Sequence, residues 1–254
     1  MLRTHPCRNL PHAGPILVAC LCIPGLVAAQ TETVSIPAIK DNTLYEDSQG
    51  ALSNGQGGDL FAGVTGFTTG FERRRALVMF DVAGNVPAGA TIRGVQLALT
   101  MTRTISGDMV VRVHRVLASW GEGTSVASGQ GGGGAAAASG DATWRHRFFN
   151  TTFWNTPGGD FAATPSAQST VGSDLGVYTW ESTQNIVDDV QAWLDQPASN
   201  AGWILIGEEG SGASSKRFAS RENPRADQRP VLLVTYMATA VSESTWGAIK
   251  GLYR

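Results

Sequence analysis

A regular alternation of apolar and polar residues between residues 91 and 101 (TIRGVQLALTM) is the feature that most limits what this chain can fold into. Side chains of a β-strand point alternately to opposite faces, so a period of two indicates a strand with one buried face. The residues predicted to face inward are Val95, Leu97, Leu99 and Met101, and those predicted to face outward are Gln96, Ala98 and Thr100. The segment is therefore predicted to be a half-buried strand.

Four further segments have strand-like patterns. Residues 76–82 (ALVMFDV) are apolar on both faces, which is typical of a central strand, and residues 109–117 alternate like a strand with one buried face. Residues 202–207 (GWILIG) and 231–236 (VLLVTY) are short apolar runs, and Pro230 suits the entry to the second of them. Turn-forming residues separate the runs at 85–90 and 106–108. Many short strands at this spacing predict an all-β, antiparallel β-sandwich.

One segment departs from this pattern. Residues 182–196 (STQNIVDDVQAWLDQ) carry apolar residues at helical spacing. Ser182 or Thr183 can cap the start of the helix, and Pro197 follows its end. The sequence therefore predicts one short helix near the C-terminal end, docked on the sandwich with Trp193 in the core.

The two ends of the chain are set apart from the sandwich. A basic start, an apolar run and the residues Val27-Ala28-Ala29 predict a signal peptide over 1–29 and hence a secreted protein. An uncleaved membrane anchor and a lipoprotein cleavage box at residues 17–20 remain as alternatives. Residues 30–238 are predicted to form a single domain, followed by a C-terminal tail over 239–254, for which a frayed end and a role in cell-surface association both stay open.

Composition excludes several classes of protein. The three cysteines all lie within 1–29, so the remaining chain has no disulfide framework and must rest on its own core. The formal net charge of the whole chain is −2, and no basic stripe points to a nucleic-acid partner. We also find no zinc-protease motif, no nucleophile elbow and no cysteine nucleophile outside the leader.

The titratable residues of the sequence give little evidence of a catalytic site. A glycosidase needs only two carboxylates that face one cleft, and the candidates are Glu122, Asp160, Glu181, Glu208 and Glu209. We interpret them as scattered surface acids, and Glu208 and Glu209 as a solvated turn. His146, between Arg145 and Arg147, is interpreted as part of an exposed basic edge. The sequence therefore predicts a protein that is not an enzyme.

Two irregular segments carry oxygen ligands of the kind that Ca²⁺ prefers. The candidate ligands are Asp41, Asn54, Asp59 and Asp160. The alternative is that these residues simply form turns. A glycine-rich stretch at 129–134 lacks the Gly-Lys-Ser/Thr ending of a phosphate loop, and it is interpreted as a flexible surface insertion.

The order of short motifs along the chain resembles the DNRLRE domain, also classed as carbohydrate-binding module family 96. The motifs are residues 41–45 (DNTLY), 54–55 (NG), 59–60 (DL), 75–81 (RALVMFD), 86–92 (VPAGATI), 120–122 (WGE), 142–144 (ATW), 154–161 (WNTPGGDF), 186–193, 200–202 (NAG) and 229–232 (RPVL). They cover nearly the whole chain after the leader. The glycine-rich insertion departs from a minimal domain and is expected to affect any site near it.

The resemblance implies a jelly-roll-like sandwich that is extracellular and non-catalytic and that binds polysaccharide, in some members an acidic one. A structural or adhesive protein of a cell surface or matrix is the alternative, and a polysaccharide hydrolase or lyase is a third. For a glycan ligand the candidate contacts are Trp144, Arg145, Arg147, Trp154, Lys216 and Arg217. The tryptophans would stack on sugar rings, and the cations would bind carboxylates. The competing interpretation is that both tryptophans are buried in the core.

Overall fold

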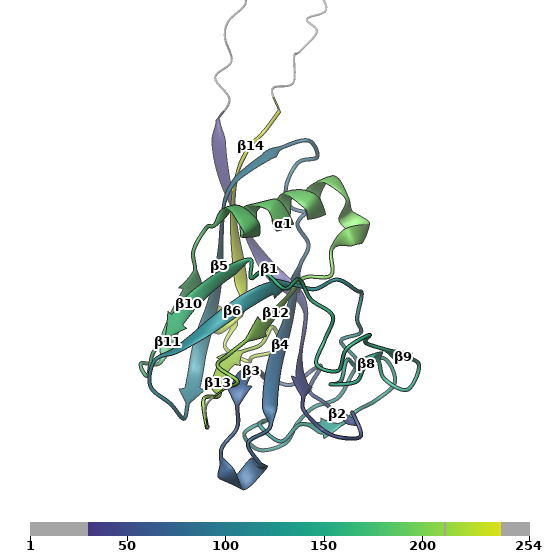
Figure 1. The fold of residues 1–254 in the computed structure, drawn as a ribbon. Helices are drawn as coiled ribbons and strands as arrows, with labels where there is room; N and C mark the ends of the chain where they lie inside the picture. Colours follow the sequence, from purple (N-terminus) through teal and green to yellow (C-terminus); the bar gives the residue numbers. More distant parts are fainter. Residues whose placement is uncertain (1–29, 211, 240–254) are drawn as a thin grey trace, which may run out of the picture.

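The protein is described by a computed structural model that covers residues 30–210 and 212–239. The predicted signal peptide and residues 240–254 of the predicted tail lie outside the described residues. The described chain is an all-β, antiparallel structure with one short α-helix near its C-terminal end, which confirms the predicted fold class (Figure 1). None of its helices within these ranges has the length and apolar character needed to cross a membrane.

The elements follow one another along the chain as strands with one helix and three short 3-10 turns. They are β1 (Thr31–Tyr45), β2 (Leu52–Ser53), β3 (Asp59–Val64), η1 (Phe67–Thr69), β4 (Arg73–Phe80), β5 (Thr91–Thr104), β6 (Met109–Arg115), β7 (Ala135–Ala136), β8 (His146–Phe148), β9 (Thr152–Phe153), β10 (Ala167–Val171), β11 (Gly176–Trp180), α1 (Gln184–Asp195), η2 (Pro197–Ser199), β12 (Trp203–Ile206), β13 (Lys216–Ala219), η3 (Ala226–Gln228) and β14 (Val231–Met237).

The long strand β1 joins the two layers of the sandwich. Its first half pairs with β14, and its second half pairs with β4 after a register shift between Ala38 and Lys40. One layer contains β11, β5, β14, β13 and β3, and the other contains β4, β12, β6 and β10 (Figure 1). All of these pairings are antiparallel, so strands far apart in the sequence become neighbours.

The main core lies between the layers and confirms the alternation in β5. Val95, Leu97, Leu99 and Met101 are all buried in this core. They meet inward side chains of the opposite layer, including Val111 and Val113 of β6 and Ala76, Val78 and Phe80 of β4. Burial of apolar surface of this kind is the main force that stabilises such a fold.

Strand β4 is buried on both faces, as its sequence predicts. Leu77 points away from the main core into a second cluster, which contains Trp120, Trp144, Trp154 and Ile204. The tryptophans come from the loops that follow β6 and from the aromatic segment 140–161, so this segment forms a third layer over the outer face of β4 and β12. Core packing therefore explains the two tryptophans of this segment, whereas Phe153 is 58% exposed.

Helix α1 begins and packs as the sequence predicts. The Thr183 hydroxyl accepts a hydrogen bond from the Ile186 N–H, and Ile186, Val190, Trp193 and Leu194 are buried. The helix also carries a buried carboxylate, Asp189, which accepts a hydrogen bond from the Trp203 indole N–H at 2.9 Å. Trp203 thereby fixes β12 to the helix.

Candidate functional site

A groove opens on the outer face of one layer, where β3, β13 and β5 lie side by side. Arg217 of β13 pairs with Phe61 of β3 on one side and with Arg103 of β5 on the other. Directly paired residues on antiparallel strands point to the same face, so the three side chains form a row. The cavity has a volume of about 310 Å³ and is lined by Phe61, Thr65, Gly66, Thr68, Arg103, Thr104, Ile105, Gln130, Gly132, Ser215 and Arg217. We call it the Arg103–Arg217 groove.

The glycine-rich segment forms one wall of this groove. The amide oxygen of Gln130 accepts hydrogen bonds from Arg103 Nη1 at 2.7 Å and from Arg217 Nη1 at 3.0 Å. Two buried side chains hold the segment from below: the Tyr45 hydroxyl donates to Gly131 O, and Arg74 Nε donates to Gly132 O. The segment lies largely at the surface, as expected, but two of its backbone carbonyls are bound by buried donors, which anchor it to the sheet.

Close packing explains the use of glycine at the wall. Gly131 has a φ of 75°, and a Cβ there would lie 3.2 Å from the Phe61 ring. A larger residue would need both a strained backbone and a displaced ring. Phe61 is consequently covered by the wall and forms the buried floor of the groove.

Exposed apolar side chains stand at the rim. Phe67 is 83% exposed and Phe71 is 49% exposed, and their ring centroids lie 6.2 Å apart. Phe67 lies in η1 between two residues that line the groove, and Ile105, also on the lining, is 49% exposed. An aromatic ring this exposed has no role in the core, so these residues are candidates for contact with a ligand.

The electrostatics of the groove favour an anion. Arg217 forms an ion pair with Asp59 at 3.4 Å, while Arg103 forms no salt bridge with any described residue. Burial raises the pKa of Asp59, and the charge of Arg217 opposes that rise. Two guanidinium groups that converge on one neutral amide oxygen offer N–H donors in the arrangement that a carboxylate would use.

The predicted aromatic platforms are not available for stacking. Trp144 and Trp154 are only 5% and 4% exposed, and both belong to the second core cluster. The Trp154 indole N–H donates to Thr143 O, and the guanidinium of Arg75 lies over the Trp144 ring. The proposal that these two residues stack on sugar rings is therefore wrong, and the competing interpretation, burial in the core, is correct.

The basic run around His146 is split between surface and interior. Arg145 is exposed and donates to Ser48 O, and Arg147 is half-buried and donates to Ser119 O. Neither lines the Arg103–Arg217 groove. His146 is buried beside Thr143 and Phe153, so its assignment to an exposed edge is wrong. His146 therefore points inward, whereas Arg145, just before β8, and Arg147 lie nearer the surface.

Lys216 is a structural residue and not a ligand contact. Its side chain is fully buried, and its ammonium group donates to three backbone carbonyls, those of Ser106, Gly107 and Gly172. Burial lowers the pKa of Lys216. Lys216 and Arg217 are adjacent on β13 and so point to opposite faces, which explains why only Arg217 reaches the groove.

We expect Lys216→Met to lower the free energy of unfolding by roughly 1–3 kcal/mol, since it leaves buried carbonyls without a donor. Arg145→Met, which removes an exposed cation, is the matched control and is expected to change stability by less than about 0.5 kcal/mol. Urea unfolding of both variants measures the difference. Equal stability of the two would contradict a structural role for Lys216.

A second, larger cavity of about 510 Å³ lies beside Arg73 and Arg75. Its cations are already paired. Arg73 binds Glu46, which holds the pKa of that carboxyl below its usual value, and Arg75 makes two hydrogen bonds of 2.8 Å to Glu209. The interpretation of Glu209 as a solvated turn residue is therefore wrong. This cavity is the weaker anion site because each guanidinium has an acidic partner.

The four predicted calcium ligands do not form one site. Asp160 accepts hydrogen bonds from the N–H groups of Asn155 and Thr156 and so closes its own turn. The Asn54 side chain donates to Asp59 O and accepts from Ala127 N, and Asp59 faces the groove arginine. Of the four, Asp41 alone belongs to a group of carboxylates that could hold a metal.

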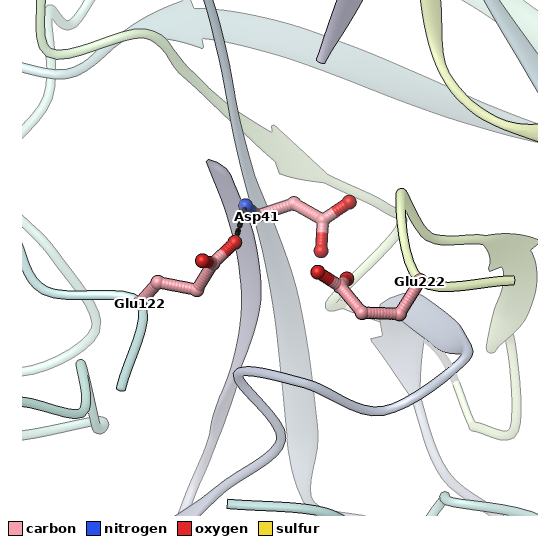
Figure 2. A group of neighbouring side chains, drawn as sticks. All are labelled: Asp41, Glu122 and Glu222. Atoms are coloured by element: carbon pink, nitrogen blue, oxygen red, sulfur yellow. Dashed lines mark hydrogen bonds between the residues drawn. The ribbon is translucent and has the colours of Figure 1, made fainter. Parts of the chain in front are cut away.

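That group, the carboxylate cluster, consists of Asp41, Glu122 and Glu222, whose potential ligand atoms lie within 4.8 Å of one another (Figure 2). Burial raises the pKa of Asp41 well above its usual value and also raises the pKa of Glu222. The sequence marks Glu122 as a scattered acid and as part of the 120–122 motif but not as a metal ligand, and it gives no signal for Glu222. Their convergence depends on loops that follow β6 and β13, which no local pattern specifies.

The sequence matches no family model and no curated protein. The resemblance to the DNRLRE domain therefore stays a prediction, and a functional assignment has to rest on the geometry of the groove and the cluster.

Proposed function

We propose that this protein is a secreted, non-catalytic module that binds an acidic polysaccharide in the Arg103–Arg217 groove. The observation that carries the proposal is the convergence of Arg103 and Arg217 on the amide oxygen of Gln130. A uronate carboxylate can replace that oxygen and accept charge-assisted hydrogen bonds from both guanidinium groups. The exposed rings of Phe67 and Phe71 then offer apolar faces to neighbouring sugar rings.

The lining of the groove supports binding rather than catalysis. Among the described residues that line it there is no Asp, Glu, His or Cys. Hydrolysis of a glycosidic bond requires a pair of carboxylates beside the scissile bond, and lyase chemistry requires a general base. The residues present can hold and orient an anionic chain, and the resemblance to a carbohydrate-binding family points to the same class of ligand.

Affinity electrophoresis tests this function. We expect polygalacturonate or alginate in the gel to retard the protein and a neutral glucan to leave its mobility unchanged. About 0.5 M NaCl should weaken the retardation, because salt screens exposed charges. Binding to neither class of polysaccharide, combined with self-association in a cell-surface fraction, would instead support the structural or adhesive alternative. Release of sugar products from the polysaccharide would support an enzyme.

A further inference from the structure

The carboxylate cluster joins three distant parts of the chain. Asp41 lies on β1, while Glu122 and Glu222 lie on the loops that follow β6 and β13. Figure 2 shows the carboxylates of Asp41 and Glu222 directed toward one another, with the Glu122 carboxylate at the Asp41 N–H. Like charges at this separation repel, so the arrangement needs a compensating positive group.

Hydrogen bonds account for one carboxylate completely. Glu122 accepts from the Asp41 N–H at 2.8 Å and from Arg221 Nε and Nη2 at 2.7 and 2.9 Å. Asp41 Oδ2 accepts from the Arg221 N–H at 2.7 Å. These contacts fix Glu122 and one oxygen of Asp41 in place.

Three buried oxygens are left without a donor. They are Asp41 Oδ1 and both carboxylate oxygens of Glu222. Asp41 is 0% exposed, so bulk solvent does not contact its free oxygen. Arg221 Nε also lies 2.8 Å from Glu222 Oε1, but its single N–H is already directed at Glu122. An unsatisfied buried carboxylate oxygen is costly, and such groups are normally paired or bound to a metal.

The carboxylates of the cluster also outnumber the cations in direct contact with them. The cluster has three carboxylates and is in direct contact with one guanidinium group, that of Arg221. Lys40, whose charge interacts with that of Glu122, donates to Trp120 O and forms no salt bridge with a described residue. Full ionisation therefore leaves two negative charges uncompensated at contact distance.

We propose that the carboxylate cluster binds a divalent cation, most simply Ca²⁺. Asp41 Oδ1 and Glu222 would be its ligands, and Glu122 would be the third carboxylate that lines the site. A proton shared by Asp41 and Glu222 would satisfy two of the three oxygens, whereas a cation can contact all of them. Ca²⁺ takes six to eight oxygen ligands in flexible geometry, so water would complete the set. The side chains of Glu122 and Glu222 keep 15% and 19% of their surface exposed, so the cluster lies close to the surface.

Thermal unfolding of the full chain, first treated with EDTA, tests the proposal. We expect about 10 mM CaCl₂ to raise the Tm by roughly 5–10 °C, since a ligand that binds only the folded state stabilises it in proportion to its occupancy. Isothermal titration with CaCl₂ should show one site. A parallel series with MgCl₂ identifies the preferred ion.

Asp41→Asn is the informative variant. Its amide oxygen can still accept the Arg221 N–H, and its amide N–H can donate to Glu222, so the variant is expected to fold and to lose both the Tm shift and the titration heat. Asp160→Asn, at another of the four predicted calcium ligands, is the control and should keep both. Absence of calcium and magnesium binding to the wild type, or full binding by the D41N variant, would overturn the proposal and favour a shared proton.

Discussion

Trp203→Ala is expected to lower the free energy of unfolding by about 3–5 kcal/mol. The side chain is completely buried, and its ring lies 4.5 Å from that of Trp193 and 6.2 Å from that of Phe80, measured between centroids. It connects helix α1 to both central strands of one layer. Removal of the indole leaves a cavity and also deprives the buried Asp189 of a donor. Chemical denaturation followed by circular dichroism measures the loss.

Two variants separate the contributions in this experiment. Trp203→Phe keeps an aromatic ring and removes the N–H, so a loss of roughly 1–3 kcal/mol is expected from the lost hydrogen bond to Asp189, which still accepts from Ser166. Phe67→Ala removes an aromatic side chain that is 83% exposed and is expected to change stability by less than about 0.5 kcal/mol. Similar losses for Phe67→Ala and Trp203→Ala would contradict the assignment of one ring to the core and the other to a binding surface.

The double variant Arg103→Gln/Arg217→Gln is expected to weaken binding of an acidic oligosaccharide by about 10²- to 10⁴-fold. Hydrogen bonds to a charged group contribute roughly 1.5–3 kcal/mol each, and both guanidinium groups are lost. Arg103→Gln alone removes an exposed cation without a salt bridge to a described residue, so it should weaken binding without affecting stability. Isothermal titration with a uronic-acid oligosaccharide gives the affinities.

The matched control is Arg145→Gln/Arg147→Gln. It makes the same change in net charge on the hairpin of β8 and β9, away from the groove lining. We expect its affinity to stay within about twofold of the wild type, since only screened, long-range electrostatics change. A larger loss in this variant than in the groove variant would place the ligand on the hairpin.

The sequence predicts those features that depend on local periodicity. The period of two in residues 91–101 identifies the inward face of β5, and the two-sided apolar character of residues 76–82 identifies β4 as central. The capping residue Thr183 marks the start of α1. In each case one short segment contains all the information, because the side-chain directions of a strand or helix follow from its own geometry.

The candidate site depends on contacts between distant segments, so it cannot be predicted from local periodicity. Arg103 and Arg217 become neighbours only through the register of β5 and β13, and Gln130 reaches them from a loop. The composition of the aromatic segment around Trp144 suggests a surface that binds sugars. Its two tryptophans instead pack over β4 as part of the core. Periodicity cannot reveal which strand face a loop will cover.

Chemical-shift mapping tests the central claim most directly. The ¹⁵N-labelled protein is titrated with a uronic-acid oligosaccharide, and perturbed amides are assigned along the chain. If the groove is the binding site, the largest shifts will fall on Arg103, Gln130 and Arg217 and on the η1 turn that carries Phe67. Shifts centred on residues 140–161, or none at saturating oligosaccharide, would contradict the proposed site.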